Sequence, residues 1–212
     1  MTTIGVCDYG VGNMRSVERA LASAGATVVI STDADTIAGC DGVVLPGVGA
    51  FAAASHALRR HGLDGAVRSA ANRGTPVLGV CLGYQLLFEH SDEGGGAPGL
   101  GVLRGHVIRL VRDGLKVPHM GWNRLRTVRR STVLADGADG AFMYFVHSYV
   151  AEPDPADVVA TTEYGGEMVA AVERGSVMGT QFHPEKSGAA GLEIYKGFVA
   201  LCETSRTEIA RT

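Results

Sequence analysis

The sequence predicts an α/β fold: a mostly parallel central sheet with helices on both faces, extended by antiparallel hairpins. Two observations carry this prediction. In the first 90 residues of the 212-residue chain, short β-branched runs alternate with Ala- and Leu-rich stretches of helical periodicity, which is the βαβ pattern of a parallel sheet. After the loop GGGAPG at residues 94–99, short apolar runs follow one another with only turns between them, which is typical of antiparallel strands.

The elements of the first half follow from apolar periodicity and from the glycine or proline at their ends. Each expected strand is a short run rich in Val, Ile or Leu. These strands are residues 4–7, 27–31, 41–45 and 76–80. Helices are expected at residues 14–24, in parts of 52–72 and at 82–89. Gly25 ends the first of these helices, and Gly62 breaks the second.

In the second half, each expected strand is again a short apolar run bounded by polar residues or glycine. These strands are residues 102–111, 125–128, 142–150, 158–162, 168–174 and 177–182. A last helix is expected at residues 190–203. No linker, internal repeat or low-complexity segment divides the chain, so we expect residues 1–212 to form one domain.

Composition excludes several classes of function. Lys and Arg number 19 against 22 Asp and Glu, a net charge of −3, which is the opposite of the basic balance of nucleic-acid-binding proteins. No run approaches the ~18 apolar residues of a membrane span, and the start does not have the pattern of a signal peptide. The four cysteines form no CxxC pair, so a cytoplasmic protein with reduced thiols is the simplest interpretation. The seven histidines show no metal-ligand spacing, and we expect neither a metal nor a cofactor.

The most informative motif is GVCLG at residues 79–83, between an expected strand and an expected helix. Glycines on both sides of Cys81 permit a sharp strand-to-helix turn that exposes a nucleophile, as in the G-x-S-x-G elbow. The first N–H groups of the helix favour a thiolate, and that of Leu82 can hold an oxyanion. A buried, inert cysteine is the alternative, and it remains our interpretation of Cys7, Cys40 and Cys202.

A candidate base follows the strand expected at residues 177–182. Pro184 forces His183 into an extended conformation, and residues i and i+2 of an extended segment point the same way. Glu185 can therefore orient one ring nitrogen of His183 while the other faces a nucleophile. Alone, the pair fits a surface salt bridge equally well; combined with Cys81, it predicts a Cys–His–Glu triad.

The loop PGVG at residues 46–49 also follows an expected strand directly. Its two glycines let backbone N–H groups turn toward a ligand, as an oxyanion hole requires. An ordinary strand-ending turn is the alternative interpretation of this loop.

These three motifs together resemble class I (triad) glutamine amidotransferases, in which the nucleophile also precedes the His-x-Glu pair by about 100 residues. Further segments are similar to the glutaminase subunits of imidazole glycerol phosphate synthases within that family. They are DYGVGN at 8–13, KVPHMGWN at 116–123 and YFVHSY at 144–149. The resemblance implies a flavodoxin-like domain that hydrolyses L-glutamine to glutamate and ammonia.

For the reaction, the resemblance implies that Cys81 attacks the side-chain amide of glutamine and forms a thioester. His183 would protonate the departing ammonia and then activate water, with Glu185 orienting its ring. The N–H groups of Leu82 and of the Val48–Gly49 segment would hold the oxyanion.

The resemblance also assigns residues to substrate and partner. Gln85 and Gly49 would contact glutamine, Glu93 would pair with its α-ammonium, and the backbone of Ser148 and Tyr149 would bind its α-carboxylate. Several further residues match positions near the partner interface and the ammonia exit: Asn13, Trp122, Asn123, Tyr144 and Lys186.

The implied partner is a cyclase subunit with a (β/α)8 barrel, which forms a heterodimer with the glutaminase. It would use the ammonia to make imidazole glycerol phosphate and AICAR in histidine biosynthesis. Three alternatives stay open: a glutaminase of another pathway (anthranilate, purine or pyridoxal phosphate), a non-catalytic subunit of the same fold, and a cysteine hydrolase that shares the elbow. The PHMGWN segment disfavours the first of these, and the intact Cys–His–Glu set disfavours the second.

Overall fold

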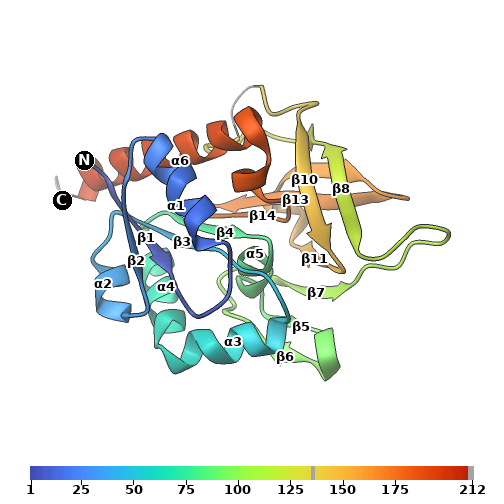
Figure 1. Ribbon diagram of the computed structural model, residues 1–212, viewed down its shortest axis with the longest axis horizontal. Coiled ribbons are helices and arrows are strands. Elements are labelled where there is room, and N and C mark those ends of the chain that lie inside the picture. Colours follow the sequence, from blue (N-terminus) through green and yellow to red (C-terminus); the bar gives the residue numbers. More distant parts are fainter. Residues whose placement is uncertain (135–136, 210–212) are drawn as a thin grey trace.

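In the computed structural model, residues 1–134 and 137–209 are described, and the largest sheet they form has eight strands (Figure 1). Its first five strands are parallel: β2 (Thr27–Ser31), β1 (Thr3–Cys7), β3 (Gly42–Leu45), β4 (Val77–Val80) and β14 (Val177–Thr180). The remaining three continue it antiparallel: β13 (Glu167–Arg174), β12 (Val158–Glu163) and β9 (Arg126–Thr127). The predicted parallel sheet with an antiparallel extension is confirmed.

Helices cover both faces of this sheet, as predicted (Figure 1). One face carries α1 (Met14–Ser23) and α6 (Gly188–Ile209), and the other carries α2 (Ala34–Ala38), α3 (Phe51–Arg60), α4 (Leu63–Asn72) and α5 (Leu82–Leu86). Alternate strand residues point to opposite faces, so Val44 packs with the first group and Val43 with the second. Within the described residues, no helix combines the length and the apolar character needed to cross a membrane.

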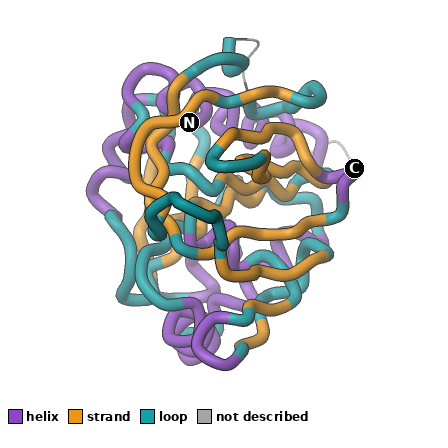
Figure 2. Tube along the Cα trace, turned by 90° about the vertical axis from the view of Figure 1, so that its right-hand side faces the viewer, coloured by secondary structure: helices purple, strands orange, loops and turns teal. Residues whose placement is uncertain are grey.

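The described residues also form two smaller sheets at one end of the molecule. The antiparallel pair β8 (His119–Arg124) and β10 (Phe142–His147) forms one, and β11 (Tyr149–Pro153), β7 (Gly105–Arg109), β5 (His90–Ser91) and β6 (Ala97–Pro98) form the other. Short 3-10 helices connect elements in the described part of the chain: η1 (Glu93–Gly95), η2 (Pro155–Asp157) and η3 (Pro184–Lys186). Figure 2 shows that the end carrying β8 and β10 presents mainly strands and loops.

Several element boundaries differ from those predicted. The helix expected at 82–89 ends at Leu86, because the carbonyls of residues 86–88 accept N–H groups from residues 100–103 instead of continuing the helix. The strand expected at 142–150 is two strands, separated at Ser148, whose carbonyl accepts from Leu110. Strands β5, β6 and β8 and helix α2 were not predicted, and α6 is longer at both ends than residues 190–203.

The parallel strands bring the sequence motifs together. Because β1, β3, β4 and β14 run in the same direction, the segments that follow them meet at one edge of the sheet. These segments are residues 8–13, 46–49, 81–83 and 181–183. The carboxyl edge of the sheet is therefore where a site built from these motifs lies.

Candidate active site

Cys81 occupies a strained turn between β4 and α5. Its φ of 53° and ψ of −109° make it the only non-glycine residue with positive φ in the described part of the chain, a strain typical of functional positions. The flanking glycines are required by close packing: a Cβ at Gly83 would overlap the Leu45 carbonyl, and one at Gly79 would lie 2.7 Å from the Tyr84 Cα. The elbow geometry that the motif predicts is present.

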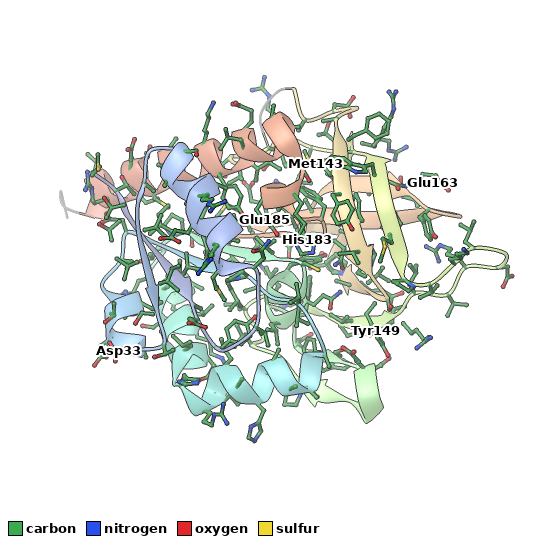
Figure 3. The ribbon with its side chains drawn as sticks, viewed as in Figure 1. Asp33, Met143, Tyr149, Glu163, His183 and Glu185 are labelled. Carbon is green, nitrogen blue, oxygen red and sulfur yellow. The ribbon has the colours of Figure 1, made fainter. Side chains whose placement is uncertain are left out.

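His183 and Glu185 form a buried pair shortly after β14. His183 is extended as predicted, but Glu185 lies in the 3-10 helix η3 and not in an extended segment. His183 Nδ1 lies 2.8 Å from Glu185 Oε1, and each side chain is 2% exposed. Backbone contacts hold the histidine in place: its N–H donates to the Tyr144 carbonyl (2.9 Å), and its own carbonyl accepts from Ser187 Oγ (2.6 Å). Figure 3 shows the two side chains pointing toward one another at the centre of the molecule.

The environment of His183 favours its protonated form. Burial by itself lowers the pKa of His183, but the neighbouring Cys81 and Glu185, which favour the charged ring, outweigh burial and raise it from 6.5 to about 9. Glu185 occupies Nδ1, which leaves Nε2 as the nitrogen available to Cys81; Nε2 is buried and has no hydrogen-bond partner within the described residues. The structure thus brings the three predicted triad residues together, and an imidazolium beside the sulfur can stabilise a thiolate.

A pocket of about 540 Å³ opens beside Cys81. Eight of the residues predicted to act on substrate line it: Val48, Gly49, Cys81, Leu82, Gln85, Glu93, Ser148 and Tyr149. Four more line it that were not predicted: Arg109, Pro118, Val146 and His147. A volume of this size accommodates a free amino acid.

Two hydrogen bonds hold the side chain of Gln85, which lines this pocket. Its Nε2 donates to the Tyr149 carbonyl (2.9 Å) and to Gln181 Oε1 (3.0 Å). Both amide protons are thereby used, so the side-chain carbonyl oxygen is the group that Gln85 can offer to a ligand. Gln181, which is fully buried, also places its Nε2 3.9 Å from the Cys81 sulfur.

The same pocket is also lined by Val48, Gly49, Leu82 and Glu93, whose contacts differ. Gly49 has φ of +102°, a conformation that favours glycine, and the neighbouring Val48 is 39% exposed. Glu93 accepts the Phe51 N–H at 2.8 Å through Oε2, so the start of α3 positions this carboxylate. Leu82, as the first residue of α5, has an N–H without an intrahelical acceptor.

Three of the predicted interface residues lie together on the outer side of β8 and β10. Trp122 and Tyr144 are paired across the strands, with ring centroids 5.9 Å apart. Lys186 Nζ lies 5.7 Å from the Tyr144 ring centroid, and the Tyr144 ring lies 6.4 Å from that of His183. The exposed face of the strand pair is therefore continuous with the triad.

The other two predicted interface residues lie elsewhere. Asn123 points to the inner side of β8, where it contacts His119 and the Glu163 carbonyl, because neighbouring strand residues face opposite sides. Asn13 is exposed at the start of α1, which packs near η3 and thus near Lys186.

The sequence reasoning missed Gln181, His119 and His147 as parts of the site. Gln181 stands two residues before His183, and the i, i+2 rule applied to His183 and Glu185 also predicts a shared direction for it. The two histidines become neighbours only through the antiparallel pairing of β8 with β10, which no local pattern predicts.

Comparison with known proteins agrees with this geometry. The family model described as glutamine amidotransferase class-I matches residues 5–201. The chain belongs to this family. It is 51% identical over 207 residues to the imidazole glycerol phosphate synthase subunit HisH of Geobacillus thermodenitrificans, covering 95% of this chain and 97% of that one. The HisH subunit of Methanosarcina acetivorans is 45% identical over 204 residues, covering 95% of this chain and all of that one.

Solved structures share the fold. A putative GMP synthase protein from Thermoplasma acidophilum superposes with a TM-score of 0.74 at 22% identity, covering 100% of this chain and 98% of that one. PurLQS from Thermotoga maritima gives 0.74 at 20% identity, covering 94% and 99%. The family and fold class predicted from the sequence are confirmed.

Proposed function

We propose that the chain is the glutaminase subunit of an imidazole glycerol phosphate synthase, which hydrolyses L-glutamine and delivers the ammonia to a cyclase subunit. Two findings together support this proposal. Subunits of that enzyme are 45–51% identical to nearly the whole chain, and Cys81, His183 and Glu185 meet beside a pocket of amino-acid size.

In the first half of the reaction, the Cys81 sulfur attacks the side-chain amide carbon of glutamine. The N–H groups of Leu82 and of the Val48–Gly49 segment face the oxyanion of the tetrahedral intermediate. His183, protonated at neutral pH, gives its proton to the nitrogen as the C–N bond breaks. Ammonia leaves, and the glutamyl group remains on sulfur as a thioester.

In the second half, the neutral ring of His183 takes a proton from water. The resulting hydroxide attacks the thioester carbon, the C–S bond breaks, and glutamate is released. Glu185 keeps the His183 ring in one orientation through both steps. Gln85 accepts from the substrate α-ammonium, Glu93 pairs with the same group, and the Ser148–Tyr149 backbone receives the α-carboxylate.

The ammonia passes to a second polypeptide, a (β/α)8-barrel cyclase that docks on β8 and β10. In neutral water ammonia becomes ammonium, which is not a nucleophile, so direct transfer needs a sealed interface. Asn13, Trp122, Asn123, Tyr144 and Lys186 are the residues assigned to that interface and the ammonia exit. In this proposal the complex is a heterodimer in the cytoplasm. A reducing compartment preserves the four cysteines as free thiols.

Glutamate release tests this proposal. The chain is assayed alone, with the cyclase subunit, and with the cyclase subunit plus its nucleotide ligand, each with Cys81→Ala as control. We expect release only in the complete mixture and none from the variant. The proposal fails if the complete mixture is inactive, and stimulation by an anthranilate or purine synthase partner instead would assign the chain to another pathway.

A further inference from the structure

A chain of hydrogen bonds joins the glutamine pocket to the inner side of β8. His147 Nδ1 lies 2.9 Å from the Tyr149 carbonyl, and its Nε2 lies 3.0 Å from His119 Nδ1. His119 Nε2 lies 3.0 Å from Asn123 Oδ1, and Asn123 Nδ2 donates to the Glu163 carbonyl at 2.6 Å. Figure 3 labels the residues at the two ends of this series of hydrogen bonds, Tyr149 at the start of β11 and Glu163 beyond β8.

The two histidines are buried inside this chain of hydrogen bonds. His119 has no exposed surface, and His147 is 6% exposed. Each ring nitrogen therefore depends on its protein neighbour for a hydrogen bond, and a mismatched contact cannot be relieved by bulk water.

The contacts require more protons than two neutral rings carry. The Tyr149 carbonyl only accepts, so His147 Nδ1 must carry a proton. Asn123 Oδ1 also only accepts, so His119 Nε2 must carry another. The contact between the two rings needs a third proton on one of its nitrogens. Two neutral imidazoles supply two protons, so the chain of hydrogen bonds needs one more.

Turning the Asn123 amide does not remove the conflict. It would offer an N–H to His119 but would place Oδ1 2.6 Å from the Glu163 carbonyl oxygen, where two acceptors repel each other. Two neutral rings thus leave one contact in which two acceptors or two donors face each other, whichever tautomers are chosen. A pair of rings with three protons satisfies every contact.

The surroundings decide which ring takes the charge. Burial and the neighbouring charges of His119 and His183 lower the pKa of His147 to about 3. Burial lowers the pKa of His119 as well, and the hydrogen bond to Asn123 offsets this lowering only in part. The His119 ring is stacked between Tyr164 and Phe145, with centroids 4.0 and 5.0 Å away, and aromatic faces attract a cation.

The charged and titratable groups that face the pair come from several elements. His183 follows β14 and faces His147, Arg109 of β7 lines the pocket beside it, and Tyr164 follows β12. No acidic side chain bonds either ring within the described residues. The compensation for a positive charge thus comes from the carbonyl oxygens at both ends and from the two aromatic faces.

We propose that His119 and His147 share one proton more than two neutral rings hold, and that this protonated pair positions the Tyr149 carbonyl in the glutamine pocket. Tyr149 also receives Gln85 Nε2, so the pair sets the position of Gln85 and adds positive charge beside the backbone assigned to the α-carboxylate. His119 and His147 are positioning residues for glutamine binding. That role rests on the proposed function, whereas the proton count does not.

The proton count is tested directly by NMR of the full chain labelled with ¹⁵N-histidine, in which two-bond ¹H–¹⁵N couplings show which ring nitrogens carry hydrogen. We expect His119 to carry both ring protons at neutral pH and His147 to carry one at Nδ1. In Asn123→Ala, where the acceptor is removed, we expect one proton on each ring at the same pH. One proton per ring in the unsubstituted chain, or an unchanged pattern in Asn123→Ala, would overturn the proposal.

The positioning role is tested by glutaminase kinetics in the complex with the cyclase subunit. Because the pair acts on binding, His119→Ala should raise the glutamine KM about tenfold and change kcat little. The exposed His56→Ala serves as the matched control and should leave both unchanged. An unchanged KM in His119→Ala, with the NMR pattern as expected, would overturn the positioning role alone, whereas an inactive unsubstituted complex would count against the proposed function.

Discussion

At the scale of single residues, the proton on His183 links stability to pH. The folded-state pKa of about 9 lies above the ordinary value of 6.5, so its stabilisation is fully present below pH 6.5 and is lost as pH rises through about 9. The difference between the two pKa values corresponds to a contribution on the order of 3 kcal/mol to the free energy of unfolding. Urea denaturation between pH 6.5 and 9.5 should show this loss in the unsubstituted chain and not in His183→Gln; equal slopes in both would contradict the assignment.

A second prediction at this scale concerns Glu185. Glu185→Gln keeps the shape of the side chain but removes the charge that orients His183 and raises its pKa. We expect kcat for glutamine hydrolysis in the complex to fall about 100-fold or more, with the pH profile shifted toward lower pH. Glu193→Gln, on the exposed side of α6, is the control; a loss of activity in that variant as well would point to a general effect of removing a carboxylate.

The residues of the triad could be predicted from sequence because each is marked by its neighbours. Glycines flank Cys81, and Pro184 directly follows His183, which is extended. His147 has no such marker: its partner His119 is 28 residues away and reaches it only through strand pairing. Sequence motifs do not reveal residues that become neighbours only when the chain folds.

At the scale of elements, the two glycines that flank Cys81 leave no room for a side chain, in contrast to Gly65 in α4. Gly83→Ala would force a Cβ against the Leu45 carbonyl, whereas Gly65 in α4 is exposed and has nothing within 4 Å. We expect Gly83→Ala to lower the free energy of unfolding by about 2 kcal/mol or more and to abolish activity. Gly65→Ala should raise it by about 0.5–1 kcal/mol. Thermal or urea unfolding measures both, and a neutral Gly83→Ala would mean that the β3–α5 contact is not tight.

Strand β8 shows why part of the fold escaped prediction. Its apolar residues Met120 and Trp122 are 62% and 52% exposed, while His119 and Asn123 face inward. An apolar-out, polar-in strand inverts the pattern by which half-buried strands are detected. Helix α2 was missed for a different reason: it has five residues, of which only Ile37 is buried, and Asp33 as its N-cap is its main signal.

At the scale of the whole molecule, the inverted pattern of β8 leads us to expect a partner surface there. Met120, Trp122 and Phe142 are exposed on the same face of the β8–β10 pair, and clustered exposed apolar groups are typical of interaction sites. Trp122→Ala should weaken, about tenfold or more, the binding of the cyclase subunit, measured by calorimetry. Glu203→Ala, at the far end of α6, should bind normally; equal affinities for both would place the interface elsewhere.

The central claim is that Cys81, activated by His183, is the nucleophile for the glutamine amide. Covalent labelling by a glutamine-shaped electrophile, read by peptide mass spectrometry on the ligand-bound complex with the cyclase subunit, tests it most directly. The account predicts one adduct per chain, on Cys81, and slower labelling in His183→Ala. No adduct, or an adduct on Cys7, Cys40 or Cys202 instead, would contradict it.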